Sequence, residues 1–75
     1  MSNKHKITED TRFAIKIDRG YIEYSEFYSE IGETQYGVTH SIKNAKKFKN
    51  SRANVIVKKF RDEGKYAEKV EVEDE

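Results

Sequence analysis

Apolar and polar residues alternate in the segment RFAIKI, at residues 12–17. Phe13, Ile15 and Ile17 share one side of an extended chain, and a lysine falls on the other. A period of two is typical of a strand with one buried face. We therefore expect a strand here, followed by a tight turn at Gly20, because glycine adopts the backbone conformations that hairpins need.

The next stretch, YIEYSEFYSEI at residues 21–31, is rich in the aromatic and β-branched residues that strands favour. Its apolar positions do not separate cleanly into two faces. Ile22, Tyr24 and Tyr28 share one parity, whereas the other large apolar residues share the opposite one. We expect a second strand that either contains a bulge or is covered on both faces.

Two glycines in GETQYG predict a turn at residues 32–37, and YGVTHSI predicts a third strand at residues 36–42. Ser41 can start a short helical turn, because its hydroxyl can accept a hydrogen bond from a free backbone amide. We expect this helical turn to stop near Asn50.

The segment RANVIVKKFRDE has the clearest helical pattern in the chain, because its apolar residues recur at intervals of three and four. Ser51 is the expected cap at the start of this helix, and Gly64 is the expected stop. KYAEKVEVE then predicts a closing strand that pairs antiparallel with the first, with Val70 and Val72 turned inward. The apolar face of the helix is formed by Ala53, Ile56, Val57 and Phe60.

Together these elements predict an α+β domain in which a small antiparallel sheet of three to four strands packs on one main helix, in the order β-β-β-α-β. The domain is expected at residues 12–72, between a flexible amino-terminal segment at 1–11 and an acidic tail at 73–75. A chain of 75 residues forms one domain with a thin core. Partner binding or a homodimer is therefore a reasonable expectation.

Charge is segregated along the chain, although the net charge is only +1. Residues 40–69 contain ten basic and three acidic residues, whereas residues 9–33 contain seven acidic and three basic ones. The basic half includes the run SIKNAKKFKNSR, with Lys46, Lys47 and Lys49. We interpret this run mainly as the solvated side of a helical turn, and its lysines also as candidate contacts to a partner.

Two alternative functions remain open for the basic half. A nucleic-acid-binding module using residues 43–61 would gain affinity by releasing counterions from phosphates. Base reading usually needs arginine or amide side chains, and Arg52 and Arg61 are among few on the helix. The third hypothesis is an oligomer that binds a nucleotide between subunits, through residues such as Lys46, Lys47 or Arg52.

The aromatic segment GYIEYSEFYSE interleaves tyrosines with carboxylates. One face of such a strand would pack on the helix, and the other would leave tyrosines beside carboxylates at the surface. Tyrosine is enriched at binding hot spots, and the carboxylates would suit a basic groove on a partner. The alternative is that the tyrosines only add buried area. The expected partner-binding residues here are Tyr24, Glu26, Tyr28 and Glu30.

The sequence has none of the patterns that mark a catalytic or metal site. It contains no cysteine and two distant histidines, and it lacks zinc-ligand spacing, phosphate-binding glycine loops and the GxSxG motif. We expect a protein that is not an enzyme and needs no cofactor or metal. No apolar run approaches the ~20 residues of a membrane span, and no secretion signal is visible, so a cytoplasmic location is the simplest expectation.

The carboxy-terminal half has the order A-K-x-F, polar link, helix with A-x-x-[IV]-[IV]-x-x-F, glycine and closing valine strand. This order resembles small accessory proteins encoded by phages and prophages of Gram-positive bacteria. The resemblance implies a short early gene product that acts on a host protein or blocks a host defence system. Together with the acidic, aromatic hairpin, it leads to our main hypothesis, a protein in the host cytoplasm that inhibits a host nuclease or defence factor without catalysis. All matching positions are packing or turn positions, so no functional residue is carried over. They are Ala45, Lys46, Phe48, Ala53, Ile56, Val57, Phe60, Gly64, Val70 and Val72.

Overall fold

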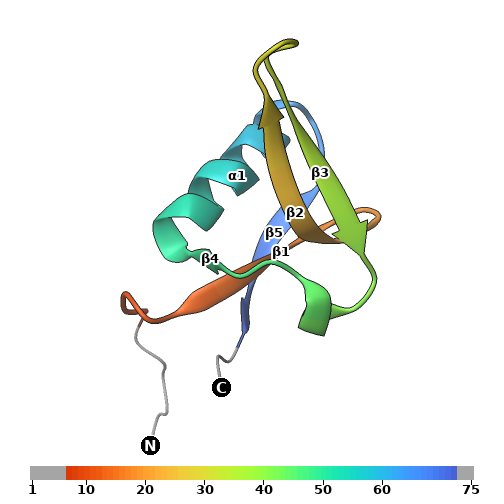
Figure 1. The fold of residues 1–75 in the computed structure, drawn as a ribbon. Coiled ribbons are helices and arrows are strands. Elements are labelled where there is room, and N and C mark those ends of the chain that lie inside the picture. The colour runs from red at the N-terminus through yellow and green to blue at the C-terminus, as the bar shows by residue number, and fades with distance from the viewer. Residues whose placement is uncertain (1–6, 73–75) are drawn as a thin grey trace, which may run out of the picture.

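The alternating segment at residues 12–17 forms the central strand of the sheet in the computed structural model, which describes residues 7–72. Strands and helix follow in the order β-β-β-β-α-β (Figure 1). The predicted α+β arrangement is confirmed, with one additional strand of two residues. The elements are β1 (Arg12–Ile17), β2 (Gly20–Tyr28), β3 (Glu33–Thr39), the 3-10 turn η1 (Ile42–Asn44), β4 (Phe48–Lys49), α1 (Asn50–Asp62) and β5 (Ala67–Val72).

Strand β1 pairs with three strands, all of them antiparallel. On one edge it pairs with β5 along its whole length, starting with Arg12 opposite Val72. On the other edge, β2 pairs with the end of β1 at Ile17, and β4 pairs with its beginning at Phe13. Because β2 and β4 share this edge, β2 leaves β1 after two residue pairs and continues with β3 as a projecting two-stranded ribbon (Figure 1).

Helix α1 packs on β1, β4 and β5 with the face that its periodicity predicts. Ala53, Ile56 and Val57 are buried, and Phe60 is half-buried against the same cluster. The prediction that these four residues lie on the sheet is therefore confirmed. The strand residues of the core are Phe13, Ile15, Ile17, Ile22, Phe48 and Ala67.

The prediction that Val70 and Val72 turn towards the core is wrong. Directly opposed residues of antiparallel strands point to the same face of a sheet. Lys69 lies opposite the buried Ile15, so Lys69 is on the helix side and both valines are on the other face, where they are half-buried. The Lys69 stem covers the core, with Nζ 4.7 Å from the ring centre of Phe13.

The turn between β2 and β3 lies at residues 29–32, earlier than the predicted 32–37. The N–H of Gly32 donates to the carbonyl of Tyr28 at 2.9 Å, and Gly32 has a φ of 67°. Strand β3 therefore also begins earlier than predicted. Gly37, the second glycine of the predicted turn, lies inside this strand.

The predicted serine caps are not formed. Helix α1 begins at Asn50, so Ser51 lies within its first turn, and Ser41 makes no side-chain hydrogen bond to η1. The short helical turn ends at Asn44 rather than near Asn50, because the following residues enter β4. The predicted helix stop is confirmed, since Gly64 follows the helix with a φ of 79°.

The ends of the predicted domain correspond to the first and last strands. Residues 1–6 of the predicted amino-terminal segment and the predicted acidic tail at 73–75 lie outside the described residues. Just before β1, the N–H of Thr11 donates to the carbonyl of Thr8 at 3.1 Å. Within residues 7–72, the structure contains no helix with the length and apolar character to cross a membrane.

Candidate functional site

A β-bulge in β2 determines which residues of the ribbon face solvent. Ile22 pairs with Val38. The next pair joins Tyr24 to Gly37, which leaves Glu23 as an extra residue. The extra residue reverses the parity of the strand, so Tyr24 lies on the opposite face from the buried Ile22. Of the two expected alternatives, a bulge or cover on both faces, the structure shows the bulge, which explains why the apolar residues of this segment do not separate by simple alternation.

Three of the predicted contact residues form a row on the outer face of the ribbon. Tyr24 is 51% exposed, Tyr28 is 41% exposed and Glu26 lies between them. The hydroxyl of Tyr28 donates a hydrogen bond to Oε1 of Glu26 at 2.5 Å, which holds the two side chains together. Glu30 lies in the turn at the tip of the ribbon and is also exposed.

The β3 strand also contributes to this face. Gln35 lies opposite Glu26 and is exposed, but the sequence pattern placed it in a turn, so nothing indicated that it extends the row. Glu33, which lies opposite Tyr28, instead lines the cleft between the ribbon and α1. We define the outer ribbon face by its four exposed side chains, which are Tyr24, Glu26, Tyr28 and Gln35.

Gly37 provides the space in which the ring of Tyr24 lies. A Cβ atom on Gly37 would be 2.0 Å from Cε2 of Tyr24, far inside van der Waals contact. The ring therefore crosses the neighbouring strand directly above the glycine. This arrangement fixes the position of one of the two exposed tyrosines.

The hydrogen bond to Glu26 raises the pKa of Tyr28, and repulsion between the phenolate and the Glu26 carboxylate raises it further. We expect Glu26→Gln to lower the pKa of Tyr28 towards its ordinary value, because the amide carries no charge. In the wild type, the raised pKa keeps the phenol neutral below about pH 10, and the hydrogen bond is lost as pH rises through the raised pKa.

An NMR titration of the tyrosine ring signals measures this shift. Tyr66 serves as an internal reference, because partial burial and the nearby Glu68 carboxylate raise its pKa independently of Glu26. A Tyr28 titration that is identical in the wild type and in Glu26→Gln would show that Glu26 does not raise the pKa of Tyr28.

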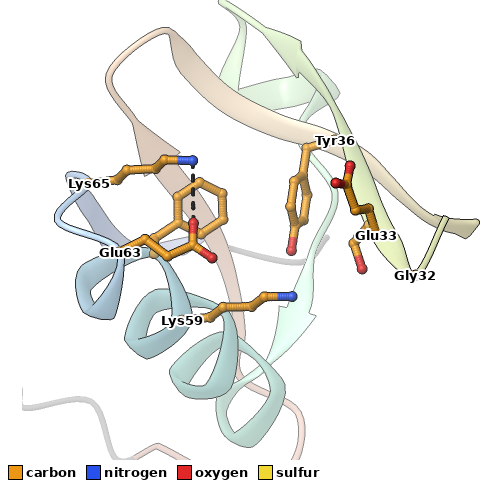
Figure 2. A pocket seen from close by; sticks show the side chains of 8 residues that line it. Gly32, Glu33, Tyr36, Lys59, Glu63 and Lys65 are labelled. Atoms are coloured by element: carbon orange, nitrogen blue, oxygen red, sulfur yellow. Dashed lines mark ion pairs between the residues drawn. The ribbon is translucent and has the colours of Figure 1, made fainter.

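The inner face of the ribbon and the end of α1 enclose an open cleft of about 500 Å³ (Figure 2). The rings of Tyr36 and Phe60 lie against each other in it, with centres 5.2 Å apart and planes tilted by 58°. Nζ of Lys65 pairs with Oε1 of Glu63 at 3.3 Å, and Lys59 lines the same cleft (Figure 2). Side chains of both signs line the cleft, so its charge does not favour an anionic nucleotide.

The predicted basic contacts lie away from the ribbon tip, around β4 (Figure 1). Lys46, Lys47 and Lys49 are all exposed. Lys49 lies opposite Arg12, and Nζ of Lys46 is 5.8 Å from the ring centre of Phe48. The structure therefore does not bring these lysines together with the tyrosines and carboxylates of the ribbon.

The part of the chain between residues 7 and 72 contains no group of three or more histidine, cysteine, aspartate or glutamate side chains placed to hold a metal ion. No protein-family model matches the sequence, and neither a curated protein nor a solved structure is significantly similar to it. The resemblance to phage accessory proteins stays a prediction.

Proposed function

We propose that this protein acts without catalysis, by binding another protein through the outer ribbon face. The observation that carries the proposal is the exposed row of Tyr24, Glu26 and Tyr28 on a ribbon that projects from the sheet. Tyrosine provides a large contact area with few rotatable bonds and is enriched at binding hot spots. The hydrogen bond between Tyr28 and Glu26 orders two of these side chains before binding, which lowers the entropic cost of association.

The charge of the ribbon indicates the chemistry of the partner. Residues 21–37 contain four glutamates and no lysine or arginine. An acidic surface accelerates encounter with a basic one and disfavours acidic partners. Basic grooves are typical of proteins that bind nucleic acids, so the proposed partner is a nuclease or another nucleic-acid-binding host defence factor. A phage-encoded inhibitor is the form of the proposal that accords with the resemblance of the carboxy-terminal half.

Replacing both exposed tyrosines tests this proposal. Tyr24→Ala combined with Tyr28→Ala should weaken partner binding by about a thousandfold, because each hot-spot side chain contributes about 2 kcal/mol and every 1.4 kcal/mol is a factor of ten. The fold should persist, since neither ring belongs to the core. The measurement is capture from a bacterial lysate by the tagged protein, followed by titration of the purified partner.

The matched control is Tyr66→Ala, which removes another exposed tyrosine outside the ribbon. This control should capture the same partner with unchanged affinity. Capture of that partner by the double variant at wild-type strength would show that the outer ribbon face is not the binding surface.

A second variant tests the geometry of the face rather than its composition. Gly37→Ala retains both tyrosines but displaces the ring of Tyr24, because the added Cβ overlaps its present position. The backbone of Gly37 is not left-handed, so alanine introduces no backbone strain there. We expect a folded protein with weaker partner binding, and unchanged affinity would show that the position of this ring is unimportant.

Nucleic-acid binding through the basic segment is a second candidate function, favoured by one observation. Lys49 lies opposite Arg12 on β1, and Lys46 and Lys47 are close to it in sequence. Within the described residues 7–72, none of these three lysines forms an ion pair. This candidate requires a salt-dependent mobility shift with DNA or RNA, lost when the three lysines become glutamates. No shift at low salt and micromolar protein would reject it.

A further inference from the structure

Strand β5 forms one edge of the sheet. Within residues 7–72 it pairs with β1 and with no other strand. It has six residues and contains neither proline nor glycine, and its register with β1 is regular along its length. A regular edge of this kind presents backbone groups on which another strand can pair.

We propose that two copies of this protein pair through their β5 strands, antiparallel and in one register, to form a continuous sheet. In this register Val70 faces the partner's Val70, and Lys69 faces the partner's Glu71. The proposal does not depend on the function of the outer ribbon face.

Symmetry limits the possible registers. A two-fold axis perpendicular to the sheet keeps both helices on the same side of the continuous sheet. Directly opposed residues then point to the same face, so a residue can face only itself or one an even number of positions away. The two-fold axis must therefore lie next to one residue of β5, and that residue faces the same residue of the other copy.

Charge and the number of paired residues then select among these registers. An axis at Ala67 or Val72, the ends of the strand, would pair only one residue of β5 in each copy. An axis at Glu68, Lys69 or Glu71 would place two like charges directly opposite each other, which is destabilising. An axis at Val70 instead places a lysine opposite a glutamate twice, once on each side of the axis. This register also pairs residues 68–72 of each copy, nearly the whole strand.

The side chains of β5 permit this register. Lys69 lies on the helix side, where Nζ is held over the ring of Phe13 and hydrogen-bonds to Oδ1 of Asn50. An ammonium group has three donors, so in the dimer Lys69 can turn one of them towards a carboxylate of the other copy. A carboxylate accepts several hydrogen bonds, so the intersubunit pair does not require Glu71 to be otherwise free. On the opposite face Val70 is half-buried, and pairing would bury it further. The dimer thus gives a role to a valine that does not face the core.

The proposed dimer leaves both ribbons accessible. In the order of the sheet, β3 and β5 lie on opposite sides of β1, so pairing at β5 does not cover the ribbon. A small domain with a thin core also gains stability from additional buried surface. Two ribbons in one dimer would increase avidity for a partner that presents two sites.

Cysteine cross-linking tests the register directly, because the chain has no cysteine of its own. Val70→Cys should form a covalent dimer with a mild oxidant, since directly opposed Cβ atoms are about 4.5–5.5 Å apart, close to disulfide distance. The control Val55→Cys lies on α1 at a position 58% exposed, away from β5, and should remain a monomer on a non-reducing gel. Equal cross-linking of both variants, or of neither, would overturn the proposal.

Charge exchange provides a second test, read by sedimentation equilibrium. Lys69→Glu and Glu71→Lys should each weaken the dimer about tenfold, because two symmetry-related pairs become repulsive. The double variant with both substitutions should recover wild-type dimerisation, which a variant that had merely lost its fold would not do. A wild-type protein that stays monomeric at all concentrations, or a dimer insensitive to these exchanges, would overturn the proposal.

Discussion

Replacing Ile15 by alanine should destabilise the domain by about 3–4 kcal/mol. Ile15 is fully buried in β1, the strand on which β2, β4, β5 and α1 converge. Removing its outer carbons leaves a cavity lined by several elements, which cannot all move inwards at once. Because small domains have a total stability on the order of 5 kcal/mol, we expect a large shift of the urea midpoint.

The matched control for this variant is Val55→Ala, which also removes aliphatic carbons but from an exposed position on α1. It should change the free energy of unfolding by less than about 0.5 kcal/mol. Similar losses for the two variants would mean that Ile15 does not lie at the centre of the core.

Gly20→Ala should also destabilise the protein severely, by about 3 kcal/mol or more, since it combines backbone strain with a steric clash. Gly20 begins β2 with a φ of 142°, which residues other than glycine rarely adopt. An added Cβ would lie 2.5 Å from the backbone oxygen of Thr39, at the end of β3. The clash is with backbone of a paired strand, so a side-chain rotation cannot relieve it.

Gly32→Ala separates the backbone strain at Gly20 from the steric clash, because it introduces only the strain. Gly32 is also left-handed, but a Cβ there would have no atom within 4 Å. This control should cost about 1 kcal/mol, the strain of a left-handed residue alone. Comparable urea midpoints for the two glycine variants would contradict the close approach of β2 and β3 at Gly20.

The outer ribbon face exists because two strands share one edge of β1. Strand β4 occupies the start of that edge, so β2 pairs with β1 only at its end. Beyond that point, the carbonyl of Ile22 accepts a hydrogen bond from the N–H of Lys46 at 2.9 Å. The bulge at Glu23 follows immediately, and the ribbon then projects freely. The same arrangement opens the cleft between the ribbon and α1.

Local periodicity was sufficient to predict much of the core. Phe13, Ile15 and Ile17 alternate because one face of their strand is buried, and Ala53 and Ile56 recur at the helical interval because one side of α1 is buried. For β1 and α1 a short segment contains the whole signal, since burial of one face constrains neighbouring positions in a fixed order. The pattern of tyrosines and carboxylates also marks Tyr24, Glu26 and Tyr28 as candidate contacts, but the bulge at Glu23 decides which face of the ribbon they occupy.

The positions that the sequence did not predict depend on pairing between distant segments. The pairing of β3 with β2 places Gly32 in the turn and Gly37 inside the strand. Val70 faces away from the core because β5 takes its register from β1, more than fifty residues earlier in the chain. The sequence by itself determined which segments are strands and which is the helix, whereas tertiary pairing decided the register, because a shift of one residue reverses every side chain of a strand.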